Sequence, residues 1–213
     1  MGYSKSTWNV FNKHLKIANL LNNEKLPDGG IIIKDENYYK KEMLELGCQA
    51  FRHPGFDPKE RYSCSYFNSI GMKCISIDIK TCGDAVKVDL KEVIAPEYQN
   101  RFDMITNSGT TEHVSELEGQ YSVFKNIHLC CKLNGFMFHF VPVNGSPRRP
   151  HSDFDYDDGF FEILAKLNRY EIISIEKYDR KKGDLYWGVC LKKVENNDFT
   201  TEKDMLYENI KIV

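Results

Sequence analysis

Small and acidic residues stand at the ends of two apolar runs, where they could bind a polar ligand. The first run, residues 43–46, contains Glu45 and is followed by Gly47. A glycine at this point lets the backbone pass close to a ligand without a clash from a Cβ atom, and the carboxylate two residues earlier can accept bonds from a cationic or amide group. The second run, residues 74–78, ends in Asp78. An acidic residue in that position typically holds the two hydroxyl groups of a ribose.

Two later runs end in polar residues as well. Residues 85–89 end in Asp89, and together with Leu90 this carboxylate could bind an exocyclic amine and pack against a purine. Alternatively, Asp89 caps a helix that begins after it. The fourth run leads into Asn107 and Ser108, whose small side chains permit a close polar turn. The four run ends together carry groups that suit a ribose and a purine.

Two histidines could take part in proton transfer. His113 ends the turn that Asn107 opens, and a histidine titrates close enough to neutral pH to act as a general base on a hydroxyl group. His113 could equally be a packed residue that only shapes the turn. His151 lies in a later loop beside Arg148 and Arg149, and these arginines could bind an anionic group. For the arginines, a solvated loop is the simpler interpretation.

Strands and helices that alternate along the chain would position these residues. Alternation of this kind implies a mostly parallel sheet with helices on both faces. Ligands of such sheets lie beyond the carboxyl ends of the strands, so the four run ends should meet at one site. The longest helix is expected to end at Asn134-Gly135 as a left-handed cap. The predicted strands cover residues 43–47, 74–78, 85–89, 102–107 and 136–143, and the predicted helices cover residues 58–70, 116–133 and 158–168.

The sheet is expected to end in a hairpin. Residues 170–178 and 185–194 are rich in β-forming residues, and the polar segment 179–184 between them has the composition of a turn. Two such runs form an antiparallel pair. The predicted fold class is therefore α/β, a three-layer sandwich whose mostly parallel seven-stranded sheet ends in an antiparallel hairpin.

The length of 213 residues suits a single domain, within which we distinguish three parts. Residues 1–40 form an N-terminal helix and cap segment, with Trp8 and Phe11 on the apolar face of the helix. This segment could close over a site as a lid or only cover the edge of the sheet. Residues 41–195 form the ligand-binding core, and residues 196–213 form a polar, peripheral tail.

Composition and charge disfavour several classes of function. The formal net charge is −2, so a strong basic field is absent and nucleic acid is not the expected partner. Since no apolar run approaches the roughly 20 residues that cross a bilayer, and the chain starts with polar residues, we expect a cytoplasmic protein with no membrane partner. The 7 cysteines form no C-x-x-C pattern and are expected to be mostly buried and reduced. The 6 histidines show no zinc-ligand spacing, so no metal site is predicted.

The order of these motifs resembles the class I S-adenosylmethionine-dependent methyltransferases. The motifs are Leu-Glu-Leu-Gly, a strand-end Asp, a short strand that ends in Asp-Leu, and Phe-Asp-Met-Ile-Thr-Asn-Ser-Gly-Thr-Thr-Glu-His-Val, and the likeness covers roughly residues 43–194. The resemblance implies that the chain binds S-adenosylmethionine as its cofactor. It also implies that Glu45 and Gly47 meet the methionine part, Asp78 the ribose, Asp89 and Leu90 the adenine, and Asn107 and Ser108 the sulfonium side.

The chain departs from the family pattern at two points. The glycine-rich loop of the family usually reads G-x-G-x-G, whereas Gly47 is followed here by Cys48-Gln49-Ala50-Phe51, and the next glycine is Gly55. The loop must therefore take another path. Between the second and third strands there is no room for a helix, so residues 81–84 are expected to form a loop.

These expectations describe a methyltransferase that acts on a small polar acceptor. Methyl transfer from a sulfonium is an in-line displacement, in which the protein mainly aligns the reactants and excludes water. A hydroxyl acceptor also needs its proton removed, and His113 or His151 would do this. The expected acceptor is a hydroxyl group of a sugar, a glycan precursor or another metabolite, and the oligomeric state is left open.

The main alternative is a protein without catalytic activity. A Rossmann-like module that binds a nucleoside or a partner protein would share the predicted fold, and the reduced glycine loop favours this interpretation. A nicotinamide-dependent dehydrogenase is disfavoured, because the G-x-G-x-x-G motif is absent and the closing hairpin does not suit that class.

Overall fold

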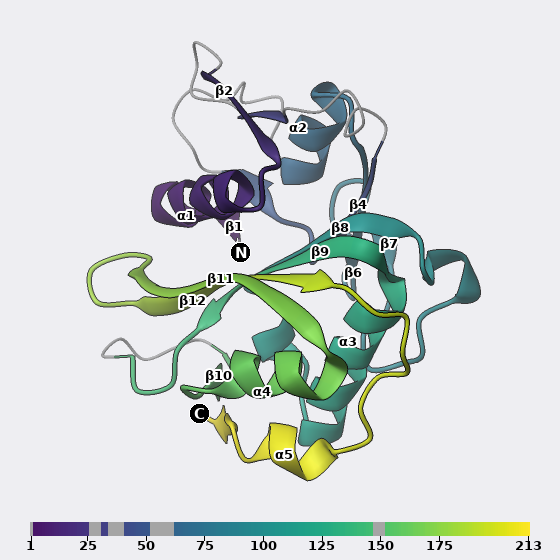
Figure 1. Ribbon diagram of the computed structural model, residues 1–213, viewed down its shortest axis with the longest axis vertical. Coiled ribbons are helices and arrows are strands. Elements are labelled where there is room, and N and C mark those ends of the chain that lie inside the picture. Colours follow the sequence, from purple (N-terminus) through teal and green to yellow (C-terminus); the bar gives the residue numbers. More distant parts are fainter. Residues whose placement is uncertain (1, 26–30, 34–40, 52–61, 147–151) are drawn as a thin grey trace.

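The centre of the molecule is a seven-stranded sheet (Figure 1). The computed structural model describes residues 2–25, 31–33, 41–51, 62–146 and 152–213. The predictions for Gly55, Arg148, Arg149 and His151 therefore lie outside the described residues. In spatial order the strands are β11 (Tyr170–Asp179), β12 (Leu185–Lys193), β9 (Cys131–Pro142), β8 (Phe102–Ser108), β4 (Glu42–Leu46), β6 (Lys73–Asp78) and β7 (Val86–Lys87).

The pairing of the strands confirms the predicted fold class. From β7 to β9 the neighbouring strands run parallel. β12 pairs antiparallel with β9, and β11 pairs antiparallel with β12, so the sheet ends in the expected hairpin. The segment between β6 and β7 contains no helix, as the short spacing predicted.

Helices cover both faces of the sheet and complete three layers. α1 (Lys5–Ile17) and α2 (Ser63–Ser69) lie on one face, and α3 (Leu117–Cys130) and α4 (Phe160–Asn168) lie on the other (Figure 1). Side chains along β9 alternate between the two faces, as in any strand. Phe138 packs in the cluster that includes α1, whereas Met137 packs in the cluster that includes α3 and α4.

α1 begins and packs as its sequence predicts. The hydroxyl of Ser4 accepts a hydrogen bond of 3.1 Å from the Thr7 amide, which is an ordinary N-cap. Trp8 and Phe11 are buried on the apolar face. The helix approaches β12 closely, because a Cβ atom on Gly188 would lie 2.6 Å from Val10 Cγ1. α1 therefore covers the sheet around β9, β11 and β12.

Short elements complete the described chain. β1 (Gly2–Tyr3) pairs in parallel with β5 (Ala50–Phe51), so the start of the chain lies beside the loop that follows Gly47. The remaining elements are β2 (Leu21–Lys25) with β3 (Ile31–Ile33), β10 (Phe154–Tyr156) with β13 (Ile210–Ile212), α5 (Lys203–Tyr207), and the 3-10 helices η1 (Pro96–Tyr98) and η2 (Thr111–His113). None of the helices in the described ranges is long and apolar enough to cross a membrane.

The longest helix ends earlier than predicted. α3 stops at Cys130, and Asn134, which has a φ of 65°, lies inside β9 and is not a helix cap. The reason is that other segments bind the last carbonyl groups of the helix. The amide of Arg101 donates to the Cys130 carbonyl at 3.0 Å, and Lys193 Nζ donates to the His128 carbonyl at 3.0 Å.

The tail after residue 195, which was expected to be peripheral, contributes buried side chains to the core. Phe199, Leu206 and Ile210 are buried and belong to the same cluster as α3 and α4. The hydroxyl of Tyr121 on α3 donates to the Thr200 carbonyl at 2.8 Å. The tail thus closes one side of the core.

Candidate functional site

A cavity of about 780 Å³ lies at the carboxyl ends of the parallel strands. This volume is in the ordinary range for small-molecule sites, roughly 300–1,000 Å³. Residues that follow β4, β6, β7 and β8 form its walls, as expected for a ligand site of such a sheet. They are residues 47–49, 77–80, 88–91, 109–110 and 113–115.

The cavity brings together some of the predicted residues and not others. Four of the seven predicted cofactor contacts line it, and so does His113; these four are Gly47, Asp78, Asp89 and Leu90. The other three, Glu45, Asn107 and Ser108, are buried and are not among its lining residues.

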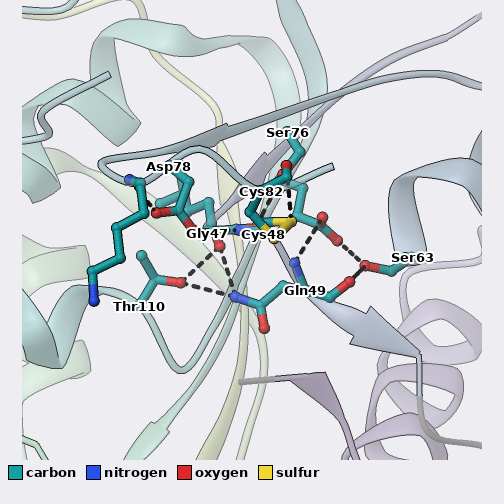
Figure 2. Close-up of a disulfide and its surroundings, with 11 residues drawn as sticks. Gly47, Cys48, Gln49, Ser63, Ser76, Asp78, Cys82 and Thr110 are labelled. Atoms are coloured by element: carbon teal, nitrogen blue, oxygen red, sulfur yellow. Dashed lines mark hydrogen bonds between the residues drawn. A yellow bond between two sulfur atoms is a disulfide. The ribbon is translucent and has the colours of Figure 1, made fainter. Parts of the chain in front are cut away.

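Position 47 requires a glycine for two reasons, its backbone conformation and the side chains next to it. Its φ is +75°, a left-handed conformation that favours glycine. A Cβ atom at this position would clash with the Thr110 hydroxyl and would lie 2.7 Å from Gln49 Nε2. Gln49 Nε2 in turn donates to Thr110 Oγ1 at 3.0 Å (Figure 2). The space above Gly47 that we expected a ligand to occupy is thus filled by two side chains of the protein.

Asp78 is held in a fixed orientation at the cavity wall. Its Oδ2 accepts a hydrogen bond of 2.8 Å from the Cys48 amide, and its Oδ1 accepts one of 2.8 Å from the Lys80 amide. Each carboxylate oxygen can accept more than one hydrogen bond. Asp78 therefore keeps the capacity to bind two hydroxyl groups of a ligand.

Asp89 and Leu90 form another part of the wall. Asp89 Oδ1 accepts a hydrogen bond of 3.0 Å from the Lys91 amide, but no helix begins here, so the carboxylate caps a turn. Leu90 is buried, with 7% of its surface exposed, and presents an apolar surface beside Val88. This combination of a carboxylate and an apolar side chain suits a purine with an exocyclic amine.

Glu45 connects the glycine turn to α2. Its carboxyl accepts a hydrogen bond from the Ser63 hydroxyl, and its Oε2 accepts one of 3.4 Å from the Gln49 amide. Burial raises the pKa of Glu45 to about 8, although these hydrogen bonds oppose the shift. The group thus holds the loop after β4 in place, from a position behind the cavity wall.

Asn107 builds the turn that follows β8. Its Nδ2 donates to Thr111 Oγ1 at 2.9 Å, and its Oδ1 accepts from the Thr111 amide at 3.2 Å. Tyr156 joins the same network, because its hydroxyl lies 2.8 Å from Thr111 Oγ1 and 2.8 Å from Gln120 Oε1. The network fixes the backbone of Gly109 and Thr110, which do line the cavity.

His113 is exposed and lines the cavity beside Val114. A Cβ atom on Gly119 would lie 3.2 Å from Val114 and 3.5 Å from Lys91, so the chain around His113 approaches the segment that carries Leu90.

Sequence reasoning missed three buried or lining groups. Gln49 stands where the family pattern has its second glycine, and its Oε1 is buried without a hydrogen-bond partner. Thr110 was only a member of the run after β8, and its hydroxyl donates to the Leu46 carbonyl at 2.7 Å. Both carboxyl oxygens of Glu112 are buried and have no side-chain hydrogen-bond partner in the part of the chain that the structure describes. The departure from G-x-G-x-G was the one available signal for Gln49, and nothing in the sequence distinguishes Glu112 from an exposed turn residue.

A disulfide joins Cys48 and Cys82, whereas most of the cysteines were expected to be buried and reduced (Figure 2). The two residues are 34 positions apart, but the end of β4 and the loop after β6 bring their Cα atoms to 6.0 Å. This separation lies within the ordinary range for a disulfide. The expectation holds for the other five cysteines, which are free.

Comparisons with known proteins identify the fold. No family model matches the sequence, and no curated protein sequence matches it. Solved structures do match. One is the 1,6-didemethyltoxoflavin-N1-methyltransferase of Burkholderia thailandensis with bound 1,6-didemethyltoxoflavin and S-adenosylhomocysteine, with a TM-score of 0.55, 14% identity, and coverage of 75% of this chain and 74% of the other.

A second match covers more of the chain. The N-methyltransferase NodS of Bradyrhizobium japonicum in complex with S-adenosylhomocysteine has a TM-score of 0.55 and 12% identity, and the match covers 90% of this chain and 93% of NodS. The chain has the class I methyltransferase fold. The resemblance stated from the motifs is thus confirmed at the level of the fold. Within the class I methyltransferase fold, the parallel strands and the closing hairpin of this chain have the expected order.

Proposed function

We propose that the protein is an S-adenosylmethionine-dependent methyltransferase that acts on a small polar acceptor. The observation that carries the proposal is the cavity at the carboxyl ends of β4, β6 and β7, with Asp78 fixed at its wall. The two similar structures hold S-adenosylhomocysteine, the demethylated form of that cofactor. Both observations support a nucleoside-containing ligand in this cavity.

The residues around the cavity fit the cofactor. Asp78 would accept hydrogen bonds from the two ribose hydroxyls, and Leu90 would pack against the adenine while Asp89 accepts from its exocyclic amine. Gln49 lines the cavity beside Gly47, and rotation of its side chain would bring its amide to the charged methionine end. The cofactor supplies an electrophilic methyl group when it is bound. The protein contributes alignment and exclusion of water.

The acceptor is proposed from charge and from proton chemistry. The net charge of −2 does not suit a nucleic acid. A small hydroxylated metabolite, such as a sugar or a glycan precursor, fits better. His113 and His151 stay the candidate general bases, and His113 lines the cavity. Amino metabolites should be tested as acceptors as well, since the two similar enzymes are N-methyltransferases.

Calorimetry with S-adenosylhomocysteine and NAD in parallel tests the proposal. We expect S-adenosylhomocysteine to bind with low-micromolar affinity, roughly 8 kcal/mol, and NAD to give no heat. Asp78→Ala should weaken binding at least about tenfold, because hydrogen bonds to a charged group contribute roughly 1.5–3 kcal/mol. The matched control is Asp84→Ala, since Asp84 is an exposed carboxylate in the same loop and does not line the cavity. Absence of binding at millimolar S-adenosylhomocysteine would overturn the methyltransferase proposal.

A non-catalytic binding module is the second candidate function. The specific observation in its favour is that Gln49 and Thr110 fill the space above Gly47. Incubation with methyl-labelled S-adenosylmethionine and a panel of hydroxylated and amino metabolites distinguishes the two. A protein that binds S-adenosylhomocysteine but transfers no label to any member of the panel would favour the module.

A further inference from the structure

The disulfide between Cys48 and Cys82 joins two walls of the cavity (Figure 2). Cys48 directly follows Gly47 and lines the cavity itself. Cys82 lies in the loop between β6 and β7, whose first residues, Ile79 and Lys80, also line the cavity. The covalent bond therefore connects the glycine turn to the segment that follows Asp78.

The same two walls also hold the Asp78 carboxylate. The amide of Cys48 donates to one of its oxygens and the amide of Lys80 donates to the other, each at 2.8 Å. A displacement of the Cys48 backbone away from the loop after β6 would lengthen the bond between the Cys48 amide and Asp78. The orientation of Asp78 thus depends on the relative position of the two segments that the disulfide joins.

In the described part of the chain, the loop between β6 and β7 also packs against Tyr62, because a Cβ atom on Gly83 would lie 2.8 Å from the Tyr62 ring. The loop contains no helix, and residues 79–81, 83 and 84 are exposed. Within it, the Ala85 amide donates to the Cys82 carbonyl at 3.0 Å, which closes a turn but does not reach the glycine turn. The disulfide attaches Cys82, in the middle of this segment, to the residue that follows Gly47.

The remaining thiols differ from this pair in accessibility. Cys48 and Cys82 are partly exposed, whereas Cys74, Cys130, Cys131 and Cys190 are buried. Burial raises the pKa of Cys130 and of Cys131 to about 12, and thiols of this kind stay protonated and unreactive. A soluble thiol reagent would therefore act on the bond between Cys48 and Cys82 and leave the buried thiols unchanged.

We propose that Cys48 and Cys82 form a redox-active pair that controls cofactor affinity, with the disulfide state as the high-affinity state. The inference rests on the proposed function, because it assigns the cavity to a nucleoside cofactor. The reductant is a dithiol. One of its thiolates attacks a cysteine sulfur and breaks the disulfide, which gives a mixed disulfide and one cysteine thiolate. The second thiol of the reductant then releases the other cysteine, so that two cysteine thiols form and the reductant leaves as its own disulfide.

The first part of the test counts thiols. The full chain, purified without reductant and denatured, should take up five alkyl groups from iodoacetamide, as expected for five free cysteines. After treatment with dithiothreitol it should take up seven, the full number of cysteines. Seven alkyl groups without any reductant would show that the bond does not form, and this would overturn the inference whatever the cavity binds.

The second part measures the dissociation constant of S-adenosylhomocysteine before and after reduction. Loss of a pre-organised wall should weaken binding about fivefold or more. Cys82→Ser should bind with the weaker affinity in both conditions, and this variant leaves the lining residue Cys48 in place. Cys64→Ser is the matched control, because Cys64 is a partly exposed free cysteine on α2 and does not line the cavity. It should respond to dithiothreitol as the unchanged protein does.

The outcomes separate this inference from the proposed function. Equal affinities before and after reduction, or tighter binding after it, overturn the redox pair and leave the methyltransferase proposal intact. No binding in either state overturns the proposed function. If Cys82→Ser does not fold, as judged by circular dichroism, the unchanged protein with and without dithiothreitol still decides the question.

Discussion

At the scale of residues, two buried carboxyl groups near the cavity differ in their surroundings. Glu45 accepts hydrogen bonds from Ser63 and from the Gln49 amide, whereas neither carboxyl oxygen of Glu112 has a side-chain partner among the described residues. Burial raises the pKa of Glu112 to about 8, although a hydrogen bond from its own backbone amide and the charge of Arg180 oppose this shift. A buried carboxylate without side-chain partners is costly, so Glu112 keeps its proton near neutral pH.

The raised pKa of Glu112 predicts how stability depends on pH. Between the unfolded value near 4.5 and the folded value of about 8, the folded state holds more protons than the unfolded state. The free energy of unfolding therefore falls as the pH rises through this window. Glu112→Gln removes this contribution, so the stability of the variant relative to the unchanged protein should rise by roughly 2–4 kcal/mol from pH 5 to pH 8.

Urea denaturation at pH 5, 6.5 and 8 measures this difference. Buried histidines such as His128 and His139 have lowered pKa values and change the free energy of unfolding below pH 6.5. Because the unchanged protein and Glu112→Gln both contain these histidines, their effect cancels in the difference. The control is Glu116→Gln, since the side chain of Glu116 is 76% exposed. A stability difference for Glu112→Gln that does not change with pH would contradict the prediction.

At the scale of elements, the long strands of the central sheet can be predicted from the sequence more easily than two-residue strands such as β1 and β5. The runs that become β4, β6 and β8 are visible because buried parallel strands are rich in apolar residues. β1 and β5 have two residues each and pair across nearly the whole N-terminal segment. Such pairs form only after the chain has folded, and no local pattern of residues predicts them.

The end of α3 illustrates the same limit. A helix as far as Leu133 agrees with the apolar spacing, and Asn134 does adopt a positive φ. The helix nevertheless ends at Cys130, because the amides of Asn100 and Arg101 bind the carbonyls of Leu129 and Cys130. These partners come from the segment before β8, so the boundary depends on tertiary contacts that a local pattern cannot contain.

The contact between α1 and β12 gives a prediction for this element. Gly188→Ala should lower the free energy of unfolding by about 1–3 kcal/mol, because the added methyl group would lie 2.6 Å from Val10 Cγ1 in a packed layer. Thermal and urea denaturation measure the loss. Gly119→Ala on α3 is the contrasting variant. Its nearest neighbour, Val114 at 3.2 Å, is partly exposed and can move, so the higher helix propensity of alanine should keep stability equal or raise it. Similar losses for both variants would contradict the close packing of α1.

At the scale of the whole molecule, part of the site could be predicted because a parallel sheet brings its carboxyl ends to one edge. Gly47, Asp78 and Asp89 stand at three such ends and line one cavity. Glu45 and Asn107 also lie near the carboxyl ends of strands, but their side chains point into hydrogen-bond networks behind the cavity wall. Spacing shows that a residue is near an edge, whereas the direction of its side chain depends on the twist and packing of the sheet.

The disulfide could not be predicted from spacing either. Seven cysteines without a recurrent pattern allow many pairings, and only the approach of two loops to a Cα separation of 6.0 Å selects Cys48 and Cys82. The buried residues of the tail could not be predicted for a related reason. Its sequence is polar on average, yet single apolar residues such as Phe199 and Leu206 complete the core.

The contribution of the tail to the stability of the whole molecule is open to a direct measurement. Phe199 is 6% exposed, and its ring lies 5.3 Å from the ring of Tyr121 and 5.6 Å from that of His128, both on α3. Truncation to alanine leaves a cavity between the tail and α3, so Phe199→Ala should lower the free energy of unfolding by roughly 3–5 kcal/mol. Met205 lies in the same tail but is 38% exposed, and Met205→Ala should change stability by less than about 1 kcal/mol.

Urea denaturation of both variants, followed by circular dichroism and by tryptophan fluorescence, tests this pair. Because a single domain unfolds cooperatively, the two signals should shift together for Phe199→Ala. Equal stabilities for the two variants would mean that residues 196–213 are peripheral, as their polar composition predicted.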